Sequence, residues 1–220
     1  MNREELIDLH PQLFHMAEAG SWPAIQKFGL LPTESIVRSS NLDDVLQSSL
    51  LNERRPESVQ FDHPDLGAVV IRDQGPLNLT LLRPKLIDVT VEEWLHTLNN
   101  RVFFWLHPMK LEKLLTARRY RNSEQDVLTV DTRSLLNAVG DQVRLSPINS
   151  GASLYNPTPR GTQTFTTIEE YDYSARRKAR GRVDAIIELA VIGGVPDISD
   201  HVTVVRRMRG TDELGEYNPS

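Results

Sequence analysis

The sequence contains no cysteine among its 220 residues, an absence that removes several classes of protein at once. It excludes a disulfide framework, a zinc site built from thiolates and a cysteine nucleophile. It also fits a reducing compartment, so we expect a cytoplasmic protein. No apolar run is long enough to span a membrane, and the charged start, Met1-Asn2-Arg3-Glu4-Glu5, is unlike a signal peptide, so no membrane partner is expected.

Several short motifs are missing as well. The sequence has no Gly-x-x-x-x-Gly-Lys-Ser/Thr loop, no Gly-x-Gly-x-x-Gly turn, no His-Glu-x-x-His pair and no Gly-x-Ser-x-Gly elbow. These absences argue against P-loop nucleotide hydrolases, dehydrogenases, zinc proteases and α/β-hydrolases. His63 and His107 each precede a proline and have no partner at metal-ligand spacing, so no metal is expected.

Length and composition fit one globular domain. With 39% hydrophobic and 25% charged residues, the chain can bury a core without cross-links. Strand-prone and helical segments alternate without regular βαβ units, which predicts an α+β fold. We expect helices at 2–9, 21–28, 33–52, 90–98, 109–119 and 133–139, strands at 13–17, 101–106 and 126–131, an edge strand at 162–167, and irregular chain at 53–84 and 145–159. The predicted domain is 1–210, followed by a frayed polar tail at 211–220.

Two ionisable side chains stand inside apolar runs. His15 lies within Leu-Phe-His-Met-Ala, and Glu188 lies within Ile-Ile-Glu-Leu-Ala-Val. For His15 alone, the simpler interpretation is a core histidine bonded to a backbone carbonyl. Glu188 either faces solvent on an edge strand or lines a cleft, because carboxylates are seldom buried without a partner. A cleft would shift the pKa of Glu188, as is common for functional carboxylates.

Two further segments are candidates for ligand contact. The run 102–105, Val-Phe-Phe-Trp, is strongly strand-prone, and one of its rings can offer a stacking face while others pack in the core. A basic segment carries five cations, which are Arg176, Arg177, Lys178, Arg180 and Arg182. It is either a solvated surface or a contact for the phosphates of a nucleic acid. Because the net charge is −5, any such contact depends on this local segment.

The order of these segments resembles the ADP-ribosyltransferase superfamily, whose members open with a His- or Arg-bearing strand and a helix ending in Gly-Leu. Here 13–17 and Gly29-Leu30-Leu31 match that opening. The chain looks like a member of a little-characterised bacterial family related to DarT-type toxins, which ADP-ribosylate DNA bases. Other matching segments are 102–105 with the helix from Met109, 127–131 with 134–136, the small-residue loop 149–153, and 182–196 around Glu188. The resemblance covers most of residues 11–205 and is weakest over 53–98.

The resemblance implies a fold and a set of roles. The fold would have two small antiparallel or mixed sheets around an NAD⁺ cleft, with flanking helices. His15 would bond the adenosine-side ribose, and Glu188 would bond the nicotinamide ribose and stabilise the charge that develops as nicotinamide leaves. An aromatic residue, Phe104 or Trp105, would pack near the nicotinamide. An arginine would pair with the diphosphate, and Arg54, Arg55 and Arg72 all compete for that role.

The resemblance therefore predicts an enzyme, a mono-ADP-ribosyltransferase with NAD⁺ as its substrate and a base of DNA or RNA as the favoured acceptor. One alternative is an NAD⁺-dependent RNA 2′-phosphotransferase, although the full set of His and Arg residues of that family is not evident. Another is a catalytically silent module that binds NAD⁺ or nucleic acid. A toxin role, with an antitoxin partner, is an analogy with the DarT type. The silent module would leave Glu188 in solvent or fill the cleft beside His15.

Overall fold

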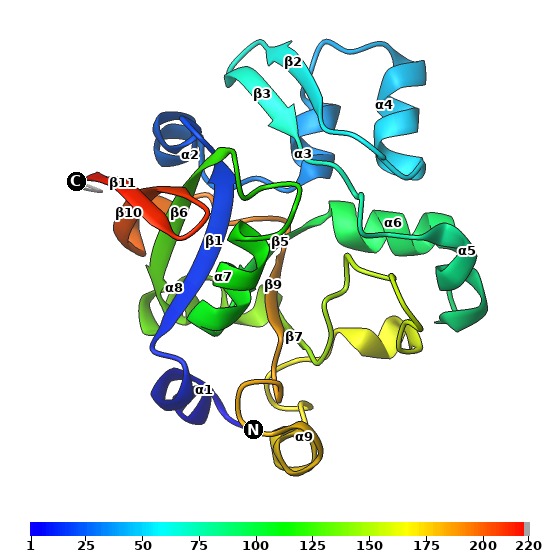
Figure 1. Ribbon diagram of the computed structural model, residues 1–220, viewed down its shortest axis with the longest axis vertical. Coiled ribbons are helices and arrows are strands. Elements are labelled where there is room, and N and C mark those ends of the chain that lie inside the picture. The colour runs from blue at the N-terminus through cyan, green and yellow to red at the C-terminus, as the bar shows by residue number, and fades with distance from the viewer. Residues whose placement is uncertain (218–220) are drawn as a thin grey trace.

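A computed structural model describes residues 1–217, and its central element is a sheet of seven strands (Figure 1). The strand order is β11-β10-β6-β1-β5-β9-β7, and every neighbouring pair is antiparallel. The strands are β1 (Gln12–Glu18), β5 (Arg101–Trp105), β6 (Glu124–Asp131), β7 (Val143–Ser146), β9 (Glu188–Ile192), β10 (Val202–Arg209) and β11 (Asp212–Tyr217). Two two-stranded sheets accompany it: the antiparallel pair β2 (Val59–His63) and β3 (Gly67–Ile71), and the parallel pair β4 (Leu86–Ile87) and β8 (Arg160–Gly161).

Short helices connect and cover these strands. They are α1 (Arg3–Leu9), α2 (Trp22–Phe28), α3 (Thr33–Arg38), α4 (Asp44–Asn52), α5 (Leu79–Leu82), α6 (Val91–Asn99), α7 (Pro108–Leu115), α8 (Thr132–Val139) and α9 (Tyr173–Arg180). Single 3₁₀ turns lie at Arg83–Lys85, Gly140–Gln142, Thr162–Thr164 and Ile198–Asp200. None of the helices within 1–217 is long and apolar enough to cross a membrane. The chain is thus α+β, as predicted, with a large antiparallel sheet.

The sheet is almost divided between β1 and β5. β1 pairs with β6 along its whole length. Its pairing with β5 is limited to one position, where Phe14 lies opposite Trp105. The resemblance implied two small sheets, whereas the structure has one sheet whose halves, β11-β10-β6-β1 and β5-β9-β7, barely join. Beyond that pair the two strands separate, and the gap is where the pockets described below are found.

The main core lies on one face of this sheet, beneath α1, α2 and α8. It is built from alternate strand residues such as Leu13, Val102 and Phe104, together with Leu135 and Leu136 of α8. On the opposite face, α7 packs against β1 and β6, and α6 packs with the chain around Phe165. The amphipathic spacing of α6 and α8 therefore buries one stripe of each helix, as expected for surface helices.

A small lobe stands apart from the sheet, at the top of Figure 1. It consists of α3, α4 and the β2–β3 hairpin, and it has its own hydrophobic cluster, which contains Val37, Leu50, Leu51, Val69 and Ile71. The sequence predicts one helix over 33–52 and irregular chain over 53–84, which differs from this arrangement. The helix is interrupted because the hydroxyls of Ser39 and Ser40 bond the carbonyls of Ser35 and Val37, and α4 restarts with the Asp43 side chain as its cap.

Other segments also differ from the sequence-based expectation. Residues 162–167 form a 3₁₀ turn and a single bridge from Thr166 to Leu145 rather than an edge strand. The tail expected to fray from 211 forms β11 as far as Tyr217, held to β10 by backbone pairing and by ion pairs of Arg206 with Glu213 and Glu216. The remaining part of that tail, 218–220, lies outside the described residues. By contrast, the helix expected at 90–98 is confirmed as α6, and Thr90 and Glu93 form a capping box at its start.

Gly29 ends α2 and lies against Pro196, so a substitution there tests how much this close contact contributes to stability. Its φ of +88° and ψ of 171° are accessible essentially to glycine, and an added Cβ would lie 2.6 Å from the Cα of Pro196. We expect Gly29→Ala to lower the free energy of unfolding by about 2–4 kcal/mol, measured by urea denaturation. Gly20→Ala is the matched control, because Gly20 has a φ of +85° but no atom within 4 Å of an added Cβ. Equal losses in the two variants would show that backbone strain alone, and not contact with Pro196, is responsible.

Candidate functional site

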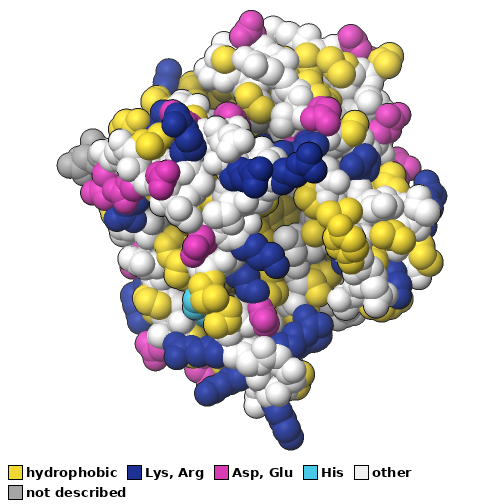
Figure 2. All heavy atoms as spheres, in the orientation of Figure 1, with side chains coloured by type: hydrophobic (Ala, Val, Ile, Leu, Met, Phe, Trp, Pro, Cys, Tyr) yellow, Lys and Arg dark blue, Asp and Glu magenta, His cyan; other side chains and the backbone are white. Residues whose placement is uncertain are grey.

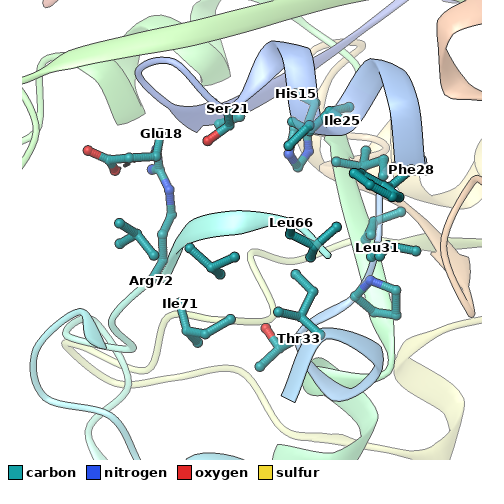
Figure 3. A pocket seen from close by; sticks show the side chains of 18 of the residues that line it. His15, Glu18, Ser21, Ile25, Phe28, Leu31, Thr33, Leu66, Ile71 and Arg72 are labelled. Carbon is teal, nitrogen blue, oxygen red and sulfur yellow. Dashed lines mark ion pairs between the residues drawn. The ribbon is translucent and has the colours of Figure 1, made fainter. Parts of the chain in front are cut away.

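Two connected pockets open where β1 and β5 separate. The larger, with a volume of about 950 Å³, lies between β1 and α2 on one side and α3 with the β2–β3 hairpin on the other. Figure 3 shows His15, Ile25 and Phe28 facing Leu66 and Ile71 across this space. The smaller, of about 300 Å³, continues toward β9. Residues that line both pockets are His15, Met16, Thr33, Arg72, Arg101 and Phe103.

His15 of β1 stands at the junction of the two pockets. Its Nδ1 lies 2.8 Å from the carbonyl oxygen of Phe103, so this nitrogen carries the proton and donates it across the gap between β1 and β5. Burial lowers the pKa of His15 to about 4, and the nearby charge of Arg72 acts in the same direction. At neutral pH the ring is therefore uncharged, and its Nε2 is an acceptor, for which no hydrogen bond is found within 1–217.

Glu188 begins β9 and lines the smaller pocket with His15. Its side chain is 4% exposed, and its two carboxylate oxygens accept the backbone N–H of Ser150 at 3.2 and 3.1 Å. Burial raises the pKa of Glu188 to about 7, against the opposing effects of the Ser150 hydrogen bonds and the charge of Arg160. Neutral pH thus falls within the titration of this carboxyl group. The structure brings together the two residues that the sequence singled out, which are 173 positions apart.

The three competing arginines are separated by the structure. Arg54 lines neither pocket and donates to the carbonyl of Gly75 at 3.0 Å. Arg55 lines the smaller pocket, but its guanidinium is committed to the carbonyls of Leu50 and Arg72 and to the side chain of Asn99. Arg72 lines both pockets, donates to Gln125 and forms an ion pair with Glu18 at 3.7 Å (Figure 3). Of the three, Arg72 has the position suited to a ligand that occupies both pockets.

The aromatic strand β5 is placed differently from the prediction. Phe104 is fully buried in the main core and lines neither pocket, so it has no place beside a ligand in this cleft. Trp105 does line the smaller pocket, and Phe103 lines both. Arg101 also lines both pockets, and its charged side chain lies over the ring of Phe165. Strand alternation explains these positions, because residues 101, 103 and 105 share one face, and that signal was available in the sequence.

The basic segment lies away from both pockets. Its five cations are on α9 and just after it, all exposed, and none lines either pocket. Figure 2 shows Lys and Arg side chains gathered at the lower end of the visible face, where Figure 1 places α9. Arg180 donates to the carbonyl of Pro147 at 2.8 Å, which ties α9 to the segment that leads to Ser150.

The pockets combine few but distinct chemical groups. A neutral imidazole and a nearly buried carboxyl group flank an apolar cavity, with arginines and aromatic rings between them. No cluster of three or more His, Asp or Glu that could hold a metal ion is found within 1–217. Such a set can orient a polar ligand, stabilise a developing positive charge with the carboxylate and take up a proton.

Comparison with protein families gives one match. Residues 11–202 match a family of unknown function, DUF7002, and the chain belongs to this family. A comparison with curated proteins finds no match. The matched range contains His15, Glu188, both pockets and α9.

The pKa of Glu188 leads to a prediction about stability. The native protein holds this proton up to about pH 7, whereas the ordinary pKa of an exposed glutamate is 4.5. The native state therefore binds more protons than the unfolded chain between these values, so stability falls as pH rises through them, and the loss is complete above the native pKa. We expect Glu188→Gln, which cannot ionise, to be more stable than the wild type by up to about 3 kcal/mol above pH 7.

The measurement is urea denaturation of both proteins across this pH range. Near pH 4 the carboxyl group is protonated in both states, so the two proteins should differ little there. A constant difference at all pH values would mean that Glu188 titrates alike in the native and unfolded states.

Proposed function

We propose that this member of the DUF7002 family is an NAD⁺-dependent ADP-ribosyltransferase, with a nucleic-acid base as its favoured acceptor. The observation that carries the proposal is the meeting of His15 and Glu188 at one pocket, which is continuous with a larger apolar pocket. The order of segments that resembles DarT-type enzymes supports the same reaction. The smaller pocket has polar side chains in its wall, among them Glu188, and the larger, with about 950 Å³, has room for a nucleoside.

The arrangement suggests how NAD⁺ would lie in the cleft. The nicotinamide ribose would enter the smaller pocket beside Glu188, with Trp105 or Phe103 against the nicotinamide ring. The adenosine would occupy the larger pocket, where the free Nε2 of His15 accepts a hydrogen bond from a ribose hydroxyl. Arg72 would face the diphosphate at the junction, where it lines both pockets.

Glu188 would act twice in the reaction. As the bond between ribose C1′ and the nicotinamide nitrogen breaks, the electron pair leaves with nicotinamide and the ribose becomes cationic, and the carboxylate stabilises this charge. A nitrogen or oxygen of the acceptor then forms the new bond to C1′ and loses its proton, which Glu188 accepts. Both steps need the ionised carboxyl group, so the rate should rise with pH through the pKa of Glu188, which is about 7.

Nicotinamide release tests this proposal directly. Purified protein is incubated with NAD⁺ alone and with single- or double-stranded DNA or RNA, and Glu188→Gln is compared with the wild type. We expect release that depends on one of these polymers, a fall in kcat of about 10²–10³-fold in Glu188→Gln, and NAD⁺ affinity within a few-fold of wild type by calorimetry. The matched control is Glu169→Gln, which removes an exposed glutamate and should behave as wild type.

The outcomes separate the competing functions. NAD⁺ binding without release under any condition would favour the silent module. Neither release nor binding would reject NAD⁺ as the ligand of this cleft. Release that Glu188→Gln does not affect would reject the role given to this carboxyl group.

The basic segment supports a polyanionic acceptor, and it has its own test. We expect the triple variant Arg176→Gln, Arg177→Gln, Lys178→Gln to bind the preferred polymer at least about tenfold more weakly in low salt, with a shallower salt dependence, because fewer counterions are released. NAD⁺ affinity should not change, since these residues lie outside both pockets. The control removes three exposed cations elsewhere, Arg83→Gln, Lys113→Gln and Arg118→Gln. Equal weakening by both triples would show that net charge, and not α9, determines the affinity.

A further inference from the structure

Arg160 is a buried cation close to Glu188 that the sequence did not single out. Its side chain is 4% exposed, and its guanidinium lies 5.9 Å from the centre of the Trp94 ring. Its Nε donates to the carbonyl of Thr158 at 3.1 Å. One terminal nitrogen donates to the carbonyls of Ser150 and Ala152 at 3.1 and 2.8 Å. Within 1–217 no carboxylate lies within 4.0 Å of this guanidinium, which is unusual because buried charges are costly unless they are paired.

Ser150 connects this arginine to the carboxyl group of the proposed active site. Its N–H donates to both oxygens of Glu188, and its carbonyl accepts from Arg160. The positive charge of Arg160 and the carboxyl group of Glu188 are thus linked by hydrogen bonds to the same residue, Ser150. The two bonds from Arg160 to the carbonyls of Ser150 and Ala152, and the two from Ser150 to Glu188, also fix the backbone of 150–152, a segment rich in small residues that has no strand or helix pairing of its own.

We propose that Arg160 is a positioning residue, which holds Ser150 so that its N–H faces Glu188 and supplies the positive charge that favours the carboxylate form of Glu188. The catalytic part of this inference rests on the proposed function, whereas the effect on ionisation does not. Arg160 does not touch either pocket, so it acts through Ser150 and through its field.

The charges around Glu188 support this role for Arg160. The smaller pocket also contains other titratable groups, which are His15, Arg55, Arg72, Asp73, Arg101 and Tyr120. Within 1–217, Arg160 is the charged group whose field lowers the pKa of Glu188, and this effect partly offsets the larger effect of burial. Without that charge, Glu188 would remain protonated further above neutral pH and would stabilise a cationic ribose poorly.

The experiment compares Arg160→Gln with Arg160→Lys. The ionisation midpoint of Glu188 is obtained from the pH dependence of the stability difference between each protein and the same protein carrying Glu188→Gln. In Arg160→Gln we expect the midpoint to rise by about one pH unit, and the pH profile of nicotinamide release to move with it. Arg160→Lys retains the positive charge but loses the planar guanidinium that bonds several carbonyls at once. The ionisation midpoint of Glu188 should therefore stay near that of wild type, while kcat falls about tenfold.

Arg144→Gln is the matched control. Arg144 lies on β7 beside β9 and also donates to backbone carbonyls, those of Asp141 and Val143, but it makes no contact with Ser150. Its removal should leave the Glu188 midpoint unchanged. An equal shift in this variant would reject a specific role for Arg160.

Other results would overturn the inference or the proposed function separately. An unchanged midpoint in Arg160→Gln rejects the charge effect, and a wild-type kcat in Arg160→Lys rejects the positioning role. If Arg160→Gln does not fold, Arg160→Lys still decides the positioning role through kcat and the midpoint. A shifted midpoint in Arg160→Gln, with no nicotinamide release by the wild type, would retain the link to Glu188 and reject the proposed reaction.

Discussion

The hydrogen bond from His15 to the carbonyl of Phe103 is the constraint on which the site depends. β1 and β5 share a single register pair, so the sheet gains little from backbone pairing between its two halves. The imidazole replaces part of that pairing, since it donates to a strand carbonyl that β1 itself does not reach. This substitution keeps the halves together while leaving a gap between them, and both pockets open at that gap. A fully paired β1–β5 ladder would close it.

Glu188 shows the cost of such a site. The carboxyl group is buried and bonded through one backbone N–H, so its ionisation competes with desolvation. The Ser150 hydrogen bonds and, less strongly, the buried charge of Arg160 offset part of this cost, and no arginine within 1–217 forms an ion pair with Glu188. A direct ion pair would stabilise the carboxylate strongly and leave it a weak base. Here burial raises the pKa of Glu188 to about 7, and the Ser150 hydrogen bonds together with the more distant charge of Arg160 limit that rise.

The sequence predicted the site only in part, for identifiable reasons. His15 and Glu188 were found because ionisable groups inside apolar strands are conspicuous. The sequence predicts Phe104 or Trp105, and not Phe103, beside the ligand, because the run of four apolar residues hides the alternation of β5, whose phase is visible once Arg101 is counted. Arg160 carries no local signal, and Ser150 stands out only as part of the small-residue loop 149–153, since their link to Glu188 joins residues 28 and 38 positions away. Likewise, β11 reads as a polar tail, because its stability comes from backbone pairing and ion pairs with β10.

The segment between β7 and β8 connects the basic helix α9 with the carboxyl group of Glu188, which are the two features that the proposed reaction requires. Pro147, at its start, accepts the hydrogen bond of Arg180 from the basic helix α9, and Ser150 follows three residues later with its N–H on Glu188. Arg160, at its end, holds the carbonyls of Ser150 and Ala152. The surface suited to a polyanion and the carboxyl group suited to a cationic ribose are therefore attached to one short stretch of backbone. A polymer bound along α9 would therefore contact a helix that is hydrogen-bonded, through Arg180, to the segment that orients Glu188.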